Sequence, residues 1–241
     1  ERLPVHPNPR ALATSQDRFV EKSFLNAIGI ATAPFAQVDD VSSLNTALDR
    51  LGRPAILKTR RFGYDGKGQV MIRAGADASE AFRAICSAPA ILEGVVPFVK
   101  EISVVAARGA DGAFAAFDVN ENVHANHILA VTTAPANITA GTAARAIAIS
   151  EKILAALDYV GVIAVEMFVV GEGADEAIVV NEIAPRVHNS GHWTIDGAET
   201  SQFEQHVRAI CGFPLGSPRR RGRVEMRNLI GHDVDAWREL L

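Results

Sequence analysis

Hydrophobic positions in the first hundred residues follow helical stripes interrupted by short strands. Apolar side chains recur at helical spacing in three segments, which predict helices at 15–28, 42–52 and 77–87. Ser15 is expected to cap the first of these helices. Compact apolar runs predict strands at 55–59, 69–73 and 90–93.

The rest of the chain predicts paired strands around one long helix. Alternating or continuous apolar runs predict strands at 102–108, 113–119, 128–133, 162–170 and 177–183. Helical stripes predict helices at 141–158 and 200–211. A final strand is expected at 224–230, with no partner in what remains of the chain. This order of hairpins and helices predicts an α+β fold rather than a doubly wound parallel sheet.

The composition is that of an ordinary folded protein. Hydrophobic residues make up 48% of the 241 positions and charged residues 22%. A formal net charge of −4 gives no reason to expect nucleic acid or an anionic membrane as the main partner. No stretch of 18 apolar residues predicts a membrane span. Cys86 and Cys211 fall in apolar helical runs, so we expect packed free thiols, a reducing compartment and a cytoplasmic protein.

A glycine-rich turn between two predicted strands is the first sign of chemistry. Three glycines within 63–68 allow the backbone to approach a ligand closely and to present N–H groups to it. Lys58, Arg61 and Lys67 add positive charge, which suits a polyphosphate. The spacing is not that of a Walker A loop, and no helix follows. Taken alone, the segment fits a tight β-turn better than a phosphate loop.

Two glutamates on adjacent predicted strands form the second candidate. Glu166 interrupts an apolar strand, and Glu182 follows Asn181 at the end of the next strand. A buried carboxylate is costly unless it is paired or bound to a metal. Two carboxylates and an amide oxygen suit Mg²⁺, which prefers oxygen ligands and often shares them with phosphates. The alternative is a glutamate at a strand end paired to an arginine.

The third candidate is a polar loop at 184–198 without clear periodicity, and loops of this length are often functional. It begins two residues after Glu182 and carries polar side chains that suit an anionic substrate, namely Arg186, His188, Asn189, Ser190 and His192. A zinc site at His188 and His192 is disfavoured because nearby proline and glycine argue against a helix. A Ser190–His188 nucleophile lacks an oxyanion signature.

Three further polar residues stand beside predicted strands. Glu93 and Glu101 flank the segment 94–100, where contacts to an adenosine would be plausible. His124 lies between two strands. On local evidence, a solvated or structurally bonded side chain fits each of these positions as well as a functional one.

Together these segments resemble the ATP-grasp superfamily, and within it the N5-carboxyaminoimidazole ribonucleotide synthetase family, the ATPase subunit of phosphoribosylaminoimidazole carboxylase. The resemblance covers about 15–230. It is carried by AILK at 55–58, FGYDGKGQ at 62–69 and YVGV at 159–162. The most specific string is NEIAPRVHNSGHWT at 181–194.

The resemblance implies an ATP-grasp fold, in which two α+β subdomains enclose ATP and the glycine turn is a lid over its phosphates. ATP contacts are then expected from Arg18, Lys58, Gly63, Tyr64, Asp65, Gly66, Lys67, Gly68, Gln69, Glu93, Glu101, His124, Asn181 and Glu182. Substrate contacts are expected from Tyr64, Arg186, His188, Asn189 and Ser190. Glu166 and Glu182 would bind Mg²⁺, and Arg186 and Lys58 would act in catalysis.

The implied reaction is ATP-dependent carboxylation of 5-aminoimidazole ribonucleotide by bicarbonate, through carboxyphosphate, in purine biosynthesis. The implied partners are these small molecules and a second copy of the chain in a homodimer. Two alternatives are a nucleotide-binding fragment without catalysis and an ATP-grasp ligase with another substrate. The string at 186–193 speaks against the second, because other branches carry different residues there.

The resemblance also implies a division of the chain. We expect a lead-in segment and helix at 1–40, a lid subdomain at 41–95, a core subdomain with the metal site at 96–212 and the start of a C-terminal domain at 213–241. Relative to the family, the sequence lacks the N-terminal domain and most of the C-terminal domain.

Overall fold

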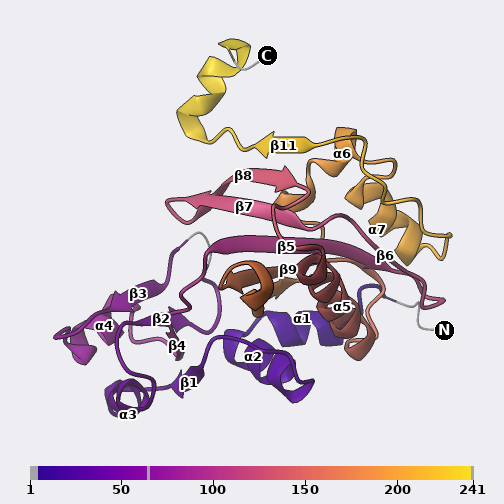
Figure 1. Ribbon diagram of the computed structural model, residues 1–241. Coiled ribbons are helices and arrows are strands. Elements are labelled where there is room, and N and C mark those ends of the chain that lie inside the picture. Colours follow the sequence, from indigo (N-terminus) through magenta and orange to yellow (C-terminus); the bar gives the residue numbers. More distant parts are fainter. Residues whose placement is uncertain (1–4, 64–65, 240–241) are drawn as a thin grey trace.

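The computed structural model describes residues 5–63 and 66–239 and contains two mainly antiparallel sheets with helices packed against them (Figure 1). This agrees with the predicted α+β class. Among the described residues, no helix is long and apolar enough to cross a membrane.

The smaller sheet has the strand order β1-β4-β2-β3. Its strands are β1 (Phe35–Val38), β2 (Ala55–Thr59), β3 (Gln69–Ile72) and β4 (Ala90–Gly94). Two helices cover it, α3 (Val41–Leu51) and α4 (Ala78–Ala84). Leu44 and Leu48 of α3 and Phe82 of α4 pack with Leu57 and Leu92 of the sheet in one apolar core. The helices therefore stabilise the sheet from which the glycine turn projects.

The larger sheet has the order β10-β9-β5-β7-β8-β11, with β6 paired to β5. Its strands are β5 (Lys100–Arg108), β6 (Phe114–Ala116), β7 (Asn120–Ala125), β8 (Ile128–Ala134), β9 (Gly161–Val170), β10 (Ala177–Ala184) and β11 (Val224–Arg227). Figure 1 shows β5 and β9 running side by side through the middle of the molecule.

Helices cover both faces of this sheet at its centre. The helices α1 (Pro9–Ser15), α2 (Arg18–Ala27) and α5 (Ala140–Ala156) contribute to the core on one face. Trp193, at the start of α6 (Thr194–Gly197), packs on the other face, and α7 (Gln202–Ile210) lies against β5 and β9. Burial on both sides explains why β9 is almost continuously apolar.

Side chains on one face of β5 change from apolar to polar along the strand. Val105 and Ala107 belong to the core beneath Trp193, while Glu101 and Ser103 continue the same face toward the other end. On β9, Ala164 lies in that core, and Glu166 faces Ser103 across the strand pair. The polar end of this face becomes one wall of the candidate site.

The first predicted helix is wrong in detail, because the segment forms two helices. α1 ends at Ser15, and α2 begins after Asp17, whose carboxylate accepts from the amides of Phe19 and Val20. Asp17 therefore caps the helix, rather than Ser15. Arg60, just after β2, donates to the same carboxylate and ties α2 to the smaller sheet.

The last predicted strand has a partner far earlier in the chain. β11 pairs antiparallel with β8, with Val224 opposite Ala134. The sequence also did not predict β7, because its Asn and Glu residues hide the strand pattern, and the predicted strand at 113–119 shortens to β6.

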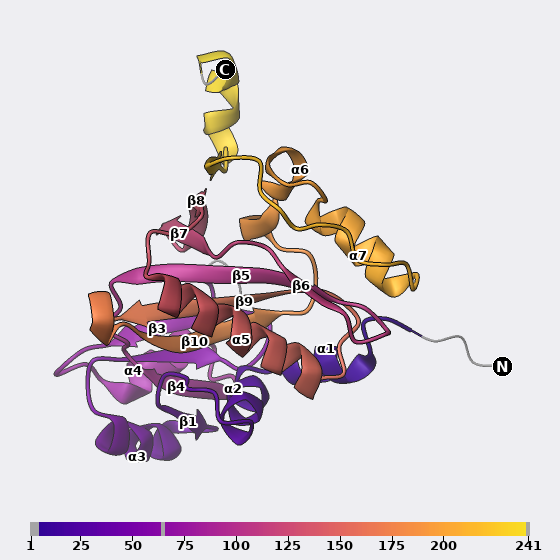
Figure 2. The ribbon, with the colours of Figure 1, turned by 45° about the vertical axis from the view of Figure 1, so that its right-hand side comes forward.

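Short helical turns complete the chain. They are 3₁₀ segments at Gly173–Asp175, Asn189–Gly191 and Gly231–Glu239. The last of these leads away from the larger sheet (Figure 2). Cys86 and Cys211 are exposed, so the expectation that both thiols are packed is wrong. The four-part division of the chain stays a prediction, and β1 precedes the predicted lid boundary at 41 although it belongs to the same sheet as β2.

Candidate functional site

A cavity of about 530 Å³ lies where the two sheets meet and collects most of the predicted site residues. The smaller sheet and its turn supply Ile56, Lys58, Gly63, Gly66, Lys67 and Gln69. The larger sheet supplies Glu101, His124, Leu129, Glu166, Phe168, Asn181 and Glu182, followed by the loop residues Arg186, His188 and Asn189. Arg18 reaches the cavity from α2. Residues distant in sequence therefore share one polar cavity.

Some predicted site residues lie elsewhere. Gly68, Glu93 and Ser190 do not line this cavity. Glu93 and Ser190 are buried, at 3% and 0% exposure, behind residues that do line it. Tyr64 and Asp65 lie outside the described residues. The ligand contacts predicted for all of these stay predictions.

The glycine turn has a backbone that needs glycine at two described positions. Gly66 and Gly68 have φ values of 75° and 72°. A Cβ on Gly68 would lie 2.7 Å from Thr59 Oγ1, and one on Gly66 would lie 2.6 Å from the His127 ring. The turn is therefore packed against Thr59 on one side and against the β7–β8 hairpin on the other.

The two candidate metal ligands are direct cross-strand partners. Glu166 on β9 lies opposite Glu182 on β10, next to a register shift between Val180 and Glu182. Such an irregularity changes where side chains point. Glu166 Oε1 lies 3.0 Å from His188 Nε2, and Glu182 Oε2 lies 2.8 Å from Arg18 Nη1. Each carboxylate thus has one cationic or hydrogen-bonding partner.

These donors fit Mg²⁺ better than zinc. Among the described residues, no group of three or more His, Cys, Asp or Glu side chains is arranged to hold a metal, so a closed zinc site at His188 and His192 has no support. Mg²⁺ commonly uses one or two carboxylates and completes its shell with water and substrate phosphates. Glu166 and Glu182 in the same cavity as Asn181 match that donor set.

Charges around Glu182 keep its carboxylate ionised. Burial favours the neutral form, but the charge and hydrogen bond of Arg18, with further charge from Lys58 and Lys22, hold the pKa of Glu182 below its ordinary value. Arg18 also donates to the carbonyl of Gly63 at 3.2 Å. Arg18 therefore joins the metal-ligand strand to the glycine turn.

A buried ion cluster supports Lys58 from behind. Lys58 Nζ lies 2.9 Å from Glu93 Oε2, and Lys22 Nζ lies 3.6 Å from Glu93 Oε1. Lys22 also donates to the carbonyl of Asn181 at 3.0 Å. Burial alone would raise the pKa of Glu93, but Lys58 and Lys22 outweigh this and lower it. Glu93 is thus an ionised support for two lysines, one of which faces the cavity.

Glu101 and His124 form a second pair in the wall. His124 Nδ1 lies 2.9 Å from Glu101 Oε2. The carboxylate of Glu101 beside the ring raises the pKa of His124, against the opposing effect of burial. The pair places a carboxylate and an imidazole beside the apolar side chains of Leu129 and Phe168.

The polar loop has a fixed structure. His188 caps the 3₁₀ turn Asn189–Gly191, and Gln202 of α7 bonds both the amide and the carbonyl of His188. A Cβ on Gly191 would lie 2.6 Å from Gln202 Oε1, so this close packing requires glycine. Asn189 Oδ1 is buried and has no hydrogen-bond partner among the described atoms. An acceptor in that position is suited to a ligand donor.

A serine–histidine–glutamate arrangement is present, but its serine is enclosed. His188 Nδ1 lies 2.9 Å from Ser190 Oγ, while its Nε2 contacts Glu166. Ser190 is fully buried and its hydroxyl also contacts Ser103 at 2.8 Å. A substrate in the cavity would not reach this hydroxyl, so the geometry gives no support to a nucleophile.

Sequence reasoning missed the residues that support the site from behind. Lys22 lies on α2, and Ser103, Asn120, Asn122 and Thr132 lie on strands of the larger sheet. All five are buried polar residues. A serine within the apolar run of β5 and a lysine within an apolar helix stripe were the available signals.

The two sheets, the glycine turn and the carboxylate pair define an ATP-grasp domain. The family model described as ATP-grasp domain matches residues 23–203, and the chain belongs to that family.

Within it, the chain is similar to curated proteins named N5-carboxyaminoimidazole ribonucleotide synthase. The protein from Brucella melitensis is 54% identical over 96% of this chain and 64% of its own length. The protein from Pseudomonas aeruginosa is 47% identical over 95% and 62%. The chain thus spans less than two thirds of these relatives.

Solved structures give the same relationship. The ADP complex of an N5-carboxyaminoimidazole ribonucleotide synthetase superimposes with a TM-score of 0.90 at 43% identity, covering 96% of this chain and 61% of the other. An Aspergillus clavatus synthase in complex with ADP and 5-aminoimidazole ribonucleotide gives 0.89 at 30% identity, covering 98% and 63%.

Proposed function

We propose that this chain is the ATP-grasp part of an N5-carboxyaminoimidazole ribonucleotide synthase, which uses ATP to carboxylate 5-aminoimidazole ribonucleotide with bicarbonate. The observation that carries the proposal is the single cavity shared by Lys58, the carboxylate pair and the loop 186–189. Relatives with these names at up to 54% identity support it.

The nucleotide fits the cavity by its chemistry. Ile56, Leu129 and Phe168 offer apolar surface for a purine ring, and Glu101 offers a carboxylate for ribose hydroxyls. Lys58, Arg18 and the amides of the glycine turn offer positive charge for phosphates. Glu166, Glu182 and Asn181 would hold Mg²⁺, which would neutralise phosphate charge.

The first step is transfer of the γ-phosphoryl group. A bicarbonate oxygen bonds to the γ-phosphorus while the bond to ADP breaks, giving carboxyphosphate and ADP. Such transfers need positioning and charge neutralisation more than covalent help from the protein. Lys58 and Arg18 neutralise charge on the phosphates, and Arg186 orients bicarbonate.

The second step is transfer of the carboxyl group. The exocyclic amine nitrogen of the ribonucleotide bonds to the carboxyl carbon, inorganic phosphate leaves, and the amine loses a proton. We infer that Asn189 Oδ1, a buried acceptor without a partner among the described atoms, accepts a hydrogen bond from this amine. Gly63, Gly66 and Lys67 line the cavity and would help to exclude water, which would otherwise hydrolyse carboxyphosphate.

The pair of Arg18 and Glu182 has a consequence for this chemistry. The two side chains lie 2.8 Å apart, so Arg18 now occupies the carboxylate that would bind the metal. We propose that Arg18 contacts a phosphate oxygen once ATP is bound, which would leave the carboxylate of Glu182 to hold Mg²⁺.

The test is ADP release by this chain with Mg-ATP and bicarbonate, with and without 5-aminoimidazole ribonucleotide. Glu182→Gln removes one proposed ligand charge, and the matched control Glu204→Gln changes an exposed glutamate on α7. Release stimulated by the ribonucleotide, lost in Glu182→Gln and kept in Glu204→Gln, supports the proposal.

Two other outcomes have distinct meanings. Mg-dependent ATP binding without release would favour the non-catalytic alternative for this chain, in which the remaining third of the relatives' length is needed for turnover. ADP release stimulated by a different amine acceptor, and not by the ribonucleotide, would favour another ATP-grasp ligase.

We also propose a homodimer and a cytoplasmic location for the protein, both supported only by the family resemblance. Light scattering of the purified chain tests the first, and cell fractionation of the protein tests the second.

A further inference from the structure

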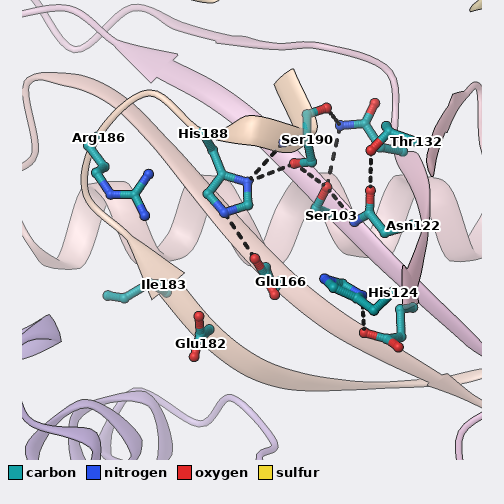
Figure 3. Close-up of polar contacts among 12 residues, drawn as sticks. Ser103, Asn122, His124, Thr132, Glu166, Glu182, Ile183, Arg186, His188 and Ser190 are labelled. Atoms are coloured by element: carbon teal, nitrogen blue, oxygen red, sulfur yellow. Dashed lines mark hydrogen bonds and ion pairs between the residues drawn. The ribbon is translucent and has the colours of Figure 1, made fainter. Parts of the chain in front are cut away.

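A row of buried polar side chains lies behind His188, on the side of the ring away from Glu166. Ser190, Ser103 and Thr132 are completely buried, and Asn122 is 5% exposed. Figure 3 shows them in a continuous series of hydrogen bonds from β8 to His188. None of these side chains faces the cavity except through His188.

The direction of these hydrogen bonds is set by Trp193, which acts on Ser103 through Asn120. Trp193 Nε1 can only donate, and it donates to Asn120 Oδ1 at 2.9 Å, which fixes the orientation of that amide. Asn120 Nδ2 then donates to the carbonyl of Ser190 at 3.0 Å and to Ser103 Oγ at 3.4 Å. Ser103 therefore receives a hydrogen bond whose direction cannot be reversed.

Asn122 acts on Ser103 in the same direction. Thr132 Oγ1 donates to Asn122 Oδ1 at 2.9 Å, and Asn122 Nδ2 donates to Ser103 Oγ at 3.0 Å. Because Ser103 Oγ already accepts from two amides, its own proton points elsewhere. It is donated to Ser190 Oγ at 2.8 Å.

Ser190 passes this direction to the imidazole. Its Oγ accepts from Ser103, so its proton is directed at His188 Nδ1, 2.9 Å away. The backbone amide of Ser190 donates to the same nitrogen at 3.3 Å. Two donors aimed at Nδ1 require that nitrogen to be unprotonated.

We propose that Ser103 and Ser190 are positioning residues that fix His188 as the tautomer protonated on Nε2. Nε2–H then donates to Glu166 Oε1 at 3.0 Å. The contact uses one carboxylate oxygen and so fixes the orientation of the other. His188 is a hydrogen-bond donor in this arrangement, with no free ring nitrogen to act as a base.

The importance of this for catalysis rests on the proposed function. If Glu166 binds Mg²⁺, a histidine that donates to one of its oxygens orients the ligand, as outer partners of metal ligands commonly do. The tautomer itself depends only on contacts within this chain. It can be measured without nucleotide, metal or substrate.

The experiment is nitrogen-15 NMR of the chain labelled on its histidines, of which there are seven. The His188 signals are assigned from their loss in His188→Gln. In the neutral ring, observed at a pH high enough that the spectrum no longer changes, we expect an unprotonated Nδ1 and a protonated Nε2. A neutral ring protonated on Nδ1 would overturn the proposal. This spectrum needs no serine variant to fold.

Ser190→Ala then tests the cause. Losing the hydroxyl donor should shift the ratio of the two tautomers at His188 by about fivefold, the equivalent of one net hydrogen bond. The matched control is Ser150→Ala, another completely buried serine whose hydroxyl donates to Ala146 within α5. A ratio unchanged in Ser190→Ala, as in the control, would refute the role of the hydroxyl.

The outcome is separable from that of the proposed function. A chain with the expected tautomer and no ADP release refutes only the activity. A chain that carboxylates the ribonucleotide while its neutral His188 ring is protonated on Nδ1 refutes only the role of the serines.

Discussion

Replacing Glu93 by glutamine should destabilise the chain far more than a single surface charge would. Glu93 is 3% exposed and lies between the ammonium groups of Lys58 and Lys22. Glutamine keeps the shape and can still accept a hydrogen bond, but it leaves two buried positive charges without a counter-charge. Breaking a buried pair in this way costs about 3–5 kcal/mol.

Because Lys58 is partly exposed, we expect the loss of stability to lie at the lower end of that range. Its side chain is 13% exposed, whereas that of Lys22 is 3% exposed, so Lys22 bears most of the penalty. We therefore expect a loss of about 3 kcal/mol in the free energy of unfolding at pH 7. In a Lys22→Met background the same change should cost at least about 1 kcal/mol less, because one uncompensated charge is gone.

The assay is urea unfolding followed by tryptophan fluorescence, since Trp193 is buried in the core of the larger sheet. Glu204→Gln serves as the control, because its carboxylate is half exposed and paired at the surface with Arg208. A loss below about 1 kcal/mol for Glu93→Gln, the scale of a surface pair, would refute the reasoning.

The same cluster predicts a pH dependence. Lys58 and Lys22 lower the pKa of Glu93 below its ordinary value of 4.5, despite the opposing effect of burial. The ionised carboxylate therefore contributes its full stability above pH 4.5 and loses it as the pH falls through the lower folded value. The difference in stability between the wild type and Glu93→Gln should shrink over that acidic range, and a constant difference would contradict it.

Three further results are expected. Gly68→Ala should lose about 1–2 kcal/mol of stability, because φ is 72° and the new Cβ would meet Thr59. Urea unfolding measures this loss, and a variant as stable as the wild type would contradict it. Leu154 lies on the buried face of α5, and Leu154→Ala should lower the free energy of unfolding by about 2–5 kcal/mol in the same assay. A loss below about 1 kcal/mol would argue against that packing. Because Glu101 raises the pKa of His124 above 6.5, this pair stabilises the chain below pH 6.5 and loses that contribution as the pH rises through the folded value. Glu101→Gln should bring the NMR titration of His124 back toward 6.5, and an unchanged titration would contradict the pairing.

Local patterns in the sequence were sufficient for most of the elements and for the proximity of the two strand glutamates. The apolar runs with a glycine turn between them predicted β2 and β3, and the glutamates at 166 and 182 predicted a carboxylate pair that the strand register brings together. These signals succeed because neighbouring strands joined by a short connection have few alternative pairings.

Features that depend on distant contacts were beyond sequence reasoning. The pairing of β11 with β8 depends on which edge of the sheet is free, and the burial of Ser190 depends on Ser103, 87 positions earlier. The split of the first helix was readable, since Asp17 is as good a cap as Ser15, but only the contact with Arg60 decides between them.

The central position of β9 has a consequence for how the molecule fluctuates. Amide hydrogens of a strand that is paired on both sides and covered on both faces exchange with solvent only in openings close to global unfolding. β9 is paired to β5 and β10, and six of its apolar side chains are at most 1% exposed, whereas the glycine turn joins only β2 to an edge strand. Glu166 is thus attached to the slowest-exchanging part of the chain, whereas Glu182 lies on β10, an edge strand of the same sheet. Local openings at the edges of the two sheets therefore leave the position of Glu166 unchanged.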